Sequence, residues 1–237
     1  MKNLIVAEAG LIAHGRGEAF DYIIGEKTTN AAMEAIKAAI ALFYLSDHPV
    51  ISINGNVAVL VPNELVELSN ILNAPLEINL FYRKKGRISA IKKKLKKAGA
   101  TNLLGTNEDG MVELEELESN RRKVDPDGIK KADTVFVPLE DGDRTEVLKK
   151  LGKNVITVDL NPLSRTALWA DITIVDNIIR ALPEMIKFAR EFKDYSQIEL
   201  RKIVKDFDNK SIIQNSLDLI IDYIGQQKEE AFKIKKQ

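Results

Sequence analysis

Short runs rich in valine and isoleucine recur along the chain and alternate with segments of helical periodicity. The clearest runs cover residues 50–53, 77–81, 134–138, 154–158 and 172–175. Between them lie segments such as 63–72 and 88–97, where apolar side chains return every three or four positions. Strands of this length separated by helices are typical of a parallel sheet that is covered on both faces. The pattern therefore predicts a doubly wound, mainly parallel α/β fold of Rossmann-like type, flanked by helices.

Helical sequence also stands before and after the alternating region. Residues 31–45 predict a buried helix that Thr28, Thr29 or Asn30 can cap. Residues 178–192 predict another helix, and mostly helical sequence follows as a C-terminal extension. We expect a single α/β domain over residues 1–237, in which the N-terminal part (1–48) and the helical tail (178–237) pack on a sheet core (49–177). The least regular stretch, 105–128, is expected to be a surface excursion.

Composition excludes several classes of protein. The chain has no cysteine, which removes disulfides, thiolate nucleophiles and iron–sulfur clusters. With only two histidines, it has no histidine-rich metal site. The 35 basic and 35 acidic side chains cancel, so no overall field favours nucleic acid or an anionic membrane. No apolar stretch approaches the roughly 20 residues of a transmembrane helix. We expect a cytoplasmic protein with neither nucleic acid nor membrane as a partner.

Ligands of an open parallel sheet collect beyond the carboxyl ends of its strands, which selects four loops. The first contains Asn54, Gly55 and Asn56, which also form an ordinary turn sequence. The second contains Arg83 within a cluster of cations, for which a solvated surface is the alternative. Asn54, Asn56 and Arg83 are therefore candidate contacts for an anionic substrate.

The third loop, residues 138–144, carries several charges. Asp143 stands three residues before Glu146, which fits the cap of a short helix over residues 146–151. Arg144 then lies in a first helical turn, where backbone amides already favour an anion, so it is a candidate anion-binding residue. Asp141 is open to three interpretations: a metal ligand, the partner of a base, or a solvated loop residue.

The fourth loop, residues 159–165, is the strongest candidate. Asp159 ends an apolar strand, Asn161 and Pro162 turn the chain, and Arg165 adds a positive charge at the end of the loop. A carboxylate at a strand end can accept hydrogen bonds from ribose hydroxyls, and arginine can clamp a phosphate through two hydrogen bonds. We predict that a phosphate-bearing ligand binds here, with Asn177 offering further polar groups after the next strand.

A glycine-rich stretch covers residues 10–25. Glycines flank His14 and Arg16, which lets the backbone approach a ligand closely. The stretch is neither a Walker loop nor a dinucleotide fingerprint, because the Gly-Lys-Ser/Thr ending and the G-x-G-x-x-G spacing are both missing. Arg16 is a candidate phosphate contact, and His14 is either a structural histidine or an acid–base catalyst.

Five segments together resemble the archaeal phosphopantoate–β-alanine ligase family, also called archaeal phosphopantothenate synthetase. They are residues 10–25 (GLIAHGRGEAFDYIIG), 49–61 (PVISINGNVAVLV), 76–83 (LEINLFYR), 132–145 (ADTVFVPLEDGDRT) and 154–180 (NVITVDLNPLSRTALWADITIVDNIIR). The segments run in order over most of the chain, and several are long and unusual. Family members usually begin with a further segment that supplies another arginine to ATP; here Met1 stands nine residues before Gly10.

The resemblance implies an ATP-dependent ligase of archaeal coenzyme A biosynthesis. It implies that phosphopantoate and β-alanine are joined through an acyl-adenylate with release of AMP and pyrophosphate, that Mg²⁺ accompanies the ATP, and that the protein is a homodimer. Carried over residue by residue, it implies ATP contacts at Arg16, Asp159, Leu160, Asn161, Arg165, Thr166, Asn177 and Ile178. Our own candidates for phosphopantoate or its phosphate are Asn54, Asn56, Arg83 and Arg144, and the candidate catalytic residues are His14 and Arg144.

Two other functions stay open. A non-catalytic ATP-binding regulatory protein on the same fold binds ATP in calorimetry without forming a product. A structural dimerisation protein shows no ATP-dependent thermal shift at all.

Overall fold

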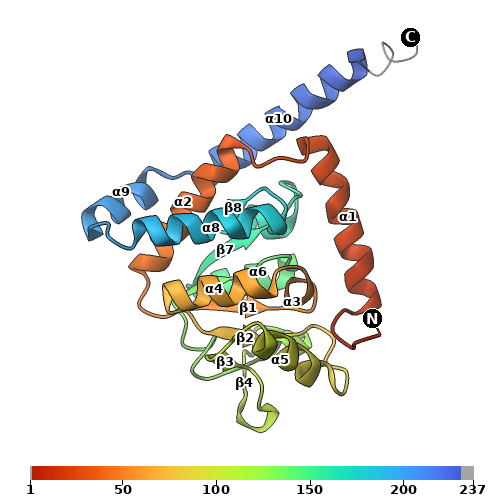
Figure 1. Ribbon diagram of the computed structural model, residues 1–237, viewed down its shortest axis with the longest axis vertical. Helices are drawn as coiled ribbons and strands as arrows, with labels where there is room; N and C mark the ends of the chain where they lie inside the picture. Colours follow the sequence, from red (N-terminus) through yellow and green to blue (C-terminus); the bar gives the residue numbers. More distant parts are fainter. Residues whose placement is uncertain (1, 231–237) are drawn as a thin grey trace.

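The computed structural model describes residues 2–230, apart from the side chain of Glu108. Its main sheet has six parallel strands in the order β3-β2-β1-β6-β7-β8, with helices on both faces (Figure 1). The strands are β1 (Pro49–Ile53), β2 (Leu76–Ile78), β3 (Leu103–Leu104), β6 (Thr134–Phe136), β7 (Asn154–Val158) and β8 (Ile172–Ile174). A short antiparallel pair, β4 (Val112–Glu113) and β5 (Lys123–Val124), lies outside this sheet. The predicted doubly wound α/β fold is confirmed.

The helices account for most of the remaining chain. They are α1 (Glu8–Ile24), α2 (Asn30–Leu45), α3 (Val57–Leu60), α4 (Pro62–Leu72), α5 (Arg87–Lys97), α6 (Gly142–Lys150), α7 (Arg165–Trp169), α8 (Ile178–Phe192), α9 (Gln197–Asp206) and α10 (Asn209–Glu230), with 3-10 turns at Glu108–Gly110 and Asn120–Arg122. The Thr29 side chain caps α2 by accepting a hydrogen bond from the Ala32 amide. Within residues 2–230, none of these helices has the length and apolarity that a membrane span requires.

The direction of winding reverses between β1 and β6. From β1 the chain builds outward through β2 to β3, and from β6 it builds the other way through β7 to β8. β1 and β6 lie side by side, with Val50 opposite Val135 and Ile51 opposite Phe136. In doubly wound sheets, the crevice beyond the carboxyl ends of two such strands is where ligands bind. The loops that follow β1 and β6 are therefore the walls of the expected site.

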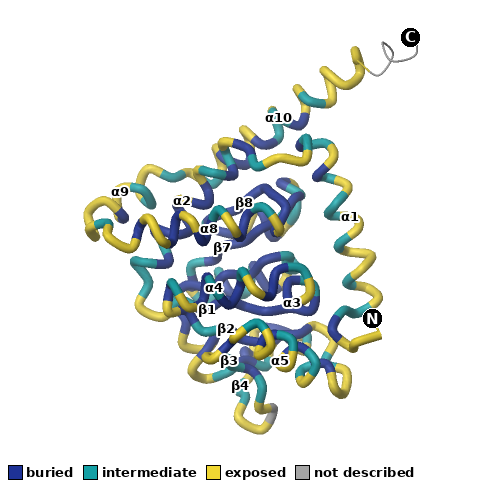
Figure 2. Tube along the Cα trace, viewed as in Figure 1, coloured by how far each residue is buried: buried dark blue, intermediate teal, exposed yellow. Residues whose placement is uncertain are grey.

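Two apolar layers hold the helices against the sheet. On one face, α2, α4 and α8 pack over the strands through side chains such as Ile36, Leu65 and Leu182. On the other face, α6 shares a second core with Leu114, Leu117 and Val124. These last three side chains are buried and come from the stretch 105–128, so that stretch closes one core and is not a mere surface excursion (Figure 2). Its apolar residues are separated by charges, which hid the pattern in the sequence.

The N-terminal and C-terminal helices meet at the carboxyl edge of the sheet. Ile24 of α1 and Ile220 of α10 form a small cluster with Leu160 and Val175. From there α1 runs along that edge, while α10 leads away from the body of the molecule (Figure 1). Residues 231–237 of the expected helical tail lie outside the described residues.

The glycine-rich stretch 10–25, whose glycines were expected to let the backbone approach a ligand closely, is helical. It forms most of α1, a continuous helix that ends at Gly25 in the left-handed conformation (φ 89°). Each glycine inside a helix costs about 1 kcal/mol relative to alanine. The cluster around Ile24 and the polar contacts of Asp21 hold the helix in place despite that cost.

Candidate functional site

Two adjoining cavities lie where the winding reverses. The larger, of about 450 Å³, lies between α1, the loop after β6 and the loop after β7. The smaller, of about 310 Å³, lies between the start of α1, the loop after β1 and the loop after β2. Both are lined by Ala13, Arg16, Asn56, Leu139, Glu140 and Asp141. The shared wall makes this one site with two compartments.

Arg16 is the cation that both cavities share. It projects from α1, and within residues 2–230 its guanidinium makes no hydrogen bond or ion pair to the protein. Its charge acts on Asp159 across the larger cavity and favours the ionised form of that carboxyl group. An arginine in this state is available to an anionic ligand from either compartment.

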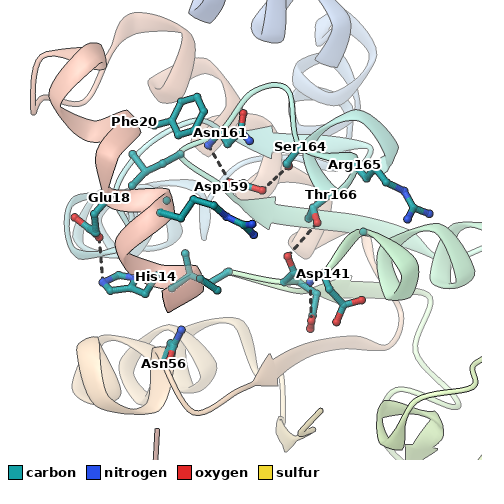
Figure 3. A pocket seen from close by; sticks show the side chains of 17 residues that line it. His14, Glu18, Phe20, Asn56, Asp141, Asp159, Asn161, Ser164, Arg165 and Thr166 are labelled. Atoms are coloured by element: carbon teal, nitrogen blue, oxygen red, sulfur yellow. Dashed lines mark hydrogen bonds and ion pairs between the residues drawn. The ribbon is translucent and has the colours of Figure 1, made fainter. Parts of the chain in front are cut away.

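Asp159 shapes the loop after β7, as Figure 3 shows. Its Oδ1 accepts a hydrogen bond from the Asn161 amide at 2.9 Å, and its Oδ2 accepts one from Ser164 Oγ at 2.5 Å. Burial raises the pKa of Asp159, against the opposing effects of Ser164, the Asn161 amide and Arg16. Ser164 Oγ in turn accepts from the Ala167 amide and caps α7. The carboxylate thus fixes the loop from which Leu160, Asn161 and Thr166 line the larger cavity.

Arg165 lines the larger cavity but its charged end is turned outward (Figure 3). Nη1 donates to Asp143 at 2.6 Å and Nη2 donates to Glu146 at 2.7 Å, both on α6. The backbones of α6 and α7 approach each other closely here: a Cβ atom added to Gly142 would stand 2.4 Å from the Cβ atom of Arg165. Thr166 Oγ1 donates to the Glu140 carbonyl at 3.0 Å and joins the two loops.

The structure places Asn177 and Ile178 next to α1 and not in the wall of either cavity. Asn177 caps α8, and its Nδ2 donates to Glu18 at 3.0 Å and to Asp21 at 2.8 Å. Ile178 is buried in the main core. Since Glu18 lines the larger cavity, Asn177 contacts the site through this side chain.

The two asparagines after β1 line the cavities and also join their walls. Asn54 Nδ2 donates to the carbonyls of Pro138 and Leu139, and Asn54 Oδ1 accepts from the Asn56 and Val57 amides. Asn56 Nδ2 donates to the carbonyl of Gly10 on α1 at 3.1 Å. Asn54 therefore links the loops after β1 and β6, and Asn56 links the first loop to α1.

Of the two arginines in the cationic cluster after β2, one lines a cavity and the other does not. Arg83, the one singled out from the sequence, donates from Nη2 to the Lys123 carbonyl at 3.2 Å and is not in the wall of either cavity. Arg87 from the same cluster lines the smaller cavity. Its guanidinium donates to the carbonyls of Tyr82 and Ile5 at 2.6 and 2.7 Å, which ties the start of the chain to the site.

The loop after β6 differs from its predicted form. Helix α6 begins at Gly142, and its cap is Asp141, whose Oδ1 accepts from the Arg144 amide at 2.9 Å; the expected cap at Asp143 is wrong. Asp143 stands two positions beyond the cap and binds Arg165 instead. Asp141 Oδ2 faces Arg121 Nε at 3.1 Å. Burial acts to raise the pKa of Asp141, but Arg121 and the Arg144 amide outweigh it and the pKa lies below its ordinary value.

Arg144 lies behind this loop and not in a cavity. Its side chain is fully buried, pairs with Glu140, and donates from Nη1 to Ser52 Oγ at 3.0 Å. The guanidinium therefore holds the loop after β6 against β1 instead of facing a ligand. The sequence placed Arg144 correctly in the first turn, but the side chain points inward because Glu140 is buried beside it.

Arg121 is a site residue that the sequence did not suggest. It reaches the smaller cavity from the stretch 105–128 and pairs with Glu140 at 2.6 Å and with Asp141. Asn79 Nδ2 fixes the stretch by donating to the carbonyls of Arg121 and Lys123. No local pattern marks Arg121, because its position depends on contacts between distant segments.

Positive charge gathers in the smaller compartment of the site. Three arginines, Arg16, Arg87 and Arg121, line the smaller cavity, and the larger one holds the first turn of α6 together with the Asp159 loop. In the part of the chain that the structure describes, no group of three or more acidic, histidine or cysteine side chains is placed to hold a metal ion. Two anionic ligands that meet at Arg16 fit this arrangement best.

Comparison with known proteins gives a consistent result. A family described as phosphopantothenate/pantothenate synthetase matches residues 31–223. A 4-phosphopantoate–β-alanine ligase of Thermococcus kodakarensis is 55% identical over 238 residues, which cover 100% of this chain and 90% of that protein. A protein of the same name from Methanosarcina mazei is 49% identical over 93% of this chain and 86% of its own length.

Proposed function

Because the chain belongs to the phosphopantothenate/pantothenate synthetase family, we propose that it joins the carboxyl group of 4-phosphopantoate to the amine of β-alanine at the expense of ATP. The carboxylate attacks the α-phosphorus of ATP and releases pyrophosphate, and the amine then displaces AMP from the acyl-adenylate. The product, 4′-phosphopantothenate, serves coenzyme A biosynthesis. The observation that carries the proposal is the pair of cavities that share the unpaired Arg16.

ATP occupies the larger cavity in this proposal. The first turn of α6 contributes the amides of Gly142 and Asp143, which precede the intrahelical hydrogen bonds and attract phosphate oxygens. Arg165 turns from its carboxylate partners to the phosphates, and Asn161 and Thr166 complete the wall. The role of Asp159 is to hold the loop in shape.

Phosphopantoate occupies the smaller cavity. Arg87 and Arg121 supply positive charge for its phosphate, and Arg16 receives its carboxylate at the boundary of the two cavities. The reacting oxygen then lies next to the α-phosphate of the nucleotide. The protein acts by positioning two anions and by offsetting their repulsion, because no nucleophilic side chain is needed for either step.

Mg²⁺ is commonly held by one or two carboxylates, several waters and substrate phosphates. Asp141, in the wall that both cavities share, would be the carboxylate that contributes here, and its Oδ2 would exchange Arg121 for the ion. A bound ion would neutralise charge on the phosphates.

The decisive assay measures the nucleotide product. Incubation with ATP, Mg²⁺, phosphopantoate and β-alanine is expected to give AMP, pyrophosphate and phosphopantothenate in equal amounts. Formation of ADP would contradict the adenylate mechanism. ATP binding in calorimetry without any product would favour the non-catalytic regulator, and the absence of ATP binding would favour the structural protein.

A homodimer and a cytoplasmic location complete the proposal. Large apolar side chains stand exposed on α1 and on α10, among them Ile12 at 75% and Ile221 at 66% exposure, and the two helices contact each other. Large exposed apolar side chains favour contact with a second protein surface. Light scattering is expected to give twice the mass of the chain. The lack of cysteine suits a reducing cytosol.

A further inference from the structure

The second step of the proposed reaction needs a proton acceptor. An alkyl amine is protonated at neutral pH and has no free electron pair with which to attack the acyl carbon. A side chain that removes this proton must reach the boundary region where the acyl carbon lies. The carboxylates and the histidine that line the two cavities are His14, Glu18, Glu140, Asp141 and Asp159.

Three of these groups are already occupied. Glu140 is buried between Arg121 and Arg144, with both oxygens engaged. Asp141 caps α6 with one oxygen and faces Arg121 with the other, so its pKa is low and it is a poor base. Asp159 accepts hydrogen bonds from Ser164 and from the Asn161 amide.

His14 and Glu18 of α1 both line the larger cavity and lie in contact with each other (Figure 3). His14 Nε2 lies 3.1 Å from Glu18 Oε1, one helical turn away, and both side chains are partly exposed. In a neutral ring whose Nε2 carries the hydrogen toward this carboxylate, Nδ1 is the acceptor nitrogen. Glu18 is itself held by Asn177 Nδ2, at 3.0 and 3.2 Å from its two oxygens. A base oriented by a carboxylate that is fixed by a third group is the arrangement that acid–base catalysis requires.

The pair lines the larger cavity, and His14 is next in sequence to Ala13, which lines both cavities. The other charged groups of the larger cavity are Arg16 on α1, Asp159 and Arg165 after β7, and Glu140 and Asp141 after β6. An imidazole titrates near neutral pH and can therefore accept a proton and pass it on.

We propose that His14 is the catalytic base that deprotonates the β-alanine ammonium, and that Glu18 is a positioning residue that orients its ring. This inference rests on the proposed function and assigns a residue to its second step. The ammonium gives one proton to His14 Nδ1, and the freed electron pair forms the C–N bond. The C–O bond to the phosphate then breaks with its electrons going to AMP. The second proton of the nitrogen goes to a phosphate oxygen of AMP, and His14 returns its proton to water.

Half-reactions separate this role from ATP binding. Exchange of labelled pyrophosphate into ATP, measured with phosphopantoate and without amine, reports the first step alone. His14→Ala and His14→Gln are expected to keep this exchange within about twofold. The rate of amide formation should fall by roughly 10²-fold or more, the usual contribution of a general base. His48→Ala is the matched control, since this exposed histidine precedes β1 and lies outside both cavities.

A nucleophile that needs no deprotonation tests whether the His14 variants fail only at removing the proton from the amine. Hydroxylamine is largely unprotonated at neutral pH, so it should trap the acyl-adenylate at equal rates in His14→Ala and in the wild-type protein. Equal loss of exchange, trapping and amide formation in both His14 variants would overturn the inference by placing His14 in nucleotide binding. Loss of exchange in the unchanged protein would instead contradict the proposed function.

Glu18→Gln tests the positioning role. The amide keeps the size of the side chain but no longer presents a charged acceptor to the ring. The maximal rate of amide formation is expected to fall and its pH profile to change, while pyrophosphate exchange is kept. An unchanged rate and profile would remove Glu18 from the pair, and full activity in His14→Gln as well would remove both residues.

Discussion

Arg16 has the most direct link to the proposed chemistry among the individual residues. Two anions approach each other when a carboxylate attacks a phosphate, and their repulsion is part of the barrier. The guanidinium of Arg16 lines both cavities, has no partner within residues 2–230 and is carried by a helix rather than by a loop. It can therefore contact both reacting groups from one position.

Arg165→Ala is expected to weaken ATP binding with little effect on folding. The side chain of Arg165 is 59% exposed, and its ion pairs with Asp143 and Glu146 stand in solvent. Exposed ion pairs contribute little to stability, so the free energy of unfolding should stay close to that of the native protein. The loss of a charge-assisted phosphate contact should raise the Kd for ATP by roughly tenfold. Calorimetry with ATP and urea unfolding measure the two effects.

Arg190→Ala is the matched control for this change. Arg190 is 67% exposed and pairs with Glu67 at 2.5 Å, on the side of α8 that faces α4. Its removal should leave the affinity for ATP unaltered. If Arg165→Ala has the same affinity as this control, Arg165 does not contact the nucleotide.

Residues that follow strands could be placed from the sequence because a strand end is a local signal. Asp159, Asn161 and Thr166 were found in this way and line the larger cavity. The direction of a long side chain is not a local property. Arg144 points inward to Glu140, and Arg121 arrives from a distant stretch, because the burial of charges is decided by tertiary contacts.

At the scale of elements, strand and helix positions followed closely from the pattern of apolar residues. Helix α8 and strand β7 have their predicted bounds. β2 is shorter than predicted and ends at Ile78, where the Asn79 side chain bonds to the segment before β5. The helical nature of residues 10–25 was missed, since three glycines in eight residues weaken a helix whose stability comes from packing at one end.

Glu77 on β2 makes the stability of the fold depend on pH. Its buried carboxylate accepts hydrogen bonds from the Asp125 and Ile129 amides, at 3.1 and 2.6 Å, and so holds the segment after β5. Burial raises its pKa from 4.5 to about 7, against these hydrogen bonds and the charge of Arg144, while Asp125 adds to the rise. The folded protein therefore binds a proton more tightly than the unfolded chain. The free energy of unfolding should fall as the pH rises from 4.5 to about 7, by about 3 kcal/mol in total.

Glu77→Gln should remove this pH dependence. The amide cannot ionise, and at pH 5 it replaces a protonated carboxyl group of the same shape that also has a donor on one side, so stability at pH 5 should change little. Urea unfolding at pH 5 and pH 8 measures both effects. Glu116→Gln, an exposed change in the stretch 105–128, should keep the pH dependence of the unchanged protein. If Glu77→Gln keeps it as well, the dependence arises at another group.

At the scale of the whole molecule, α1 connects the two cavities to the far end of the sheet. His14, Arg16 and Glu18 of this helix line the larger cavity, while Asn56 contacts its first turn. Its last turns are held by a polar network in which Asn177 and Arg180 of α8 both bind Asp21. The geometry of both compartments therefore depends on an attachment that lies outside them.

Asp21→Asn is expected to weaken the binding of both substrates together. Asp21 is buried and accepts from Asn177 at 2.8 Å and from Arg180 at 2.5 Å, so an amide in its place opposes two donors. The free energy of unfolding should fall by about 1–3 kcal/mol. The KM values for ATP and phosphopantoate should both rise, because α1 forms a wall of each cavity. Asp206→Asn, an exposed change on α9, serves as the control.

The same variant has a pH dependence opposite in sign to that of Glu77. Burial acts to raise the pKa of Asp21, but Arg180 and Asn177 outweigh it, and the pKa lies below its model-compound value of 3.8. Its contribution to stability is therefore present above that value and is lost as the pH falls through the lower pKa of the folded state. The difference in unfolding free energy between Asp21→Asn and the unchanged protein should be full at pH 6 and shrink in stronger acid. A rise in the KM of one substrate alone, at any pH, would mean that α1 does not act as a common wall.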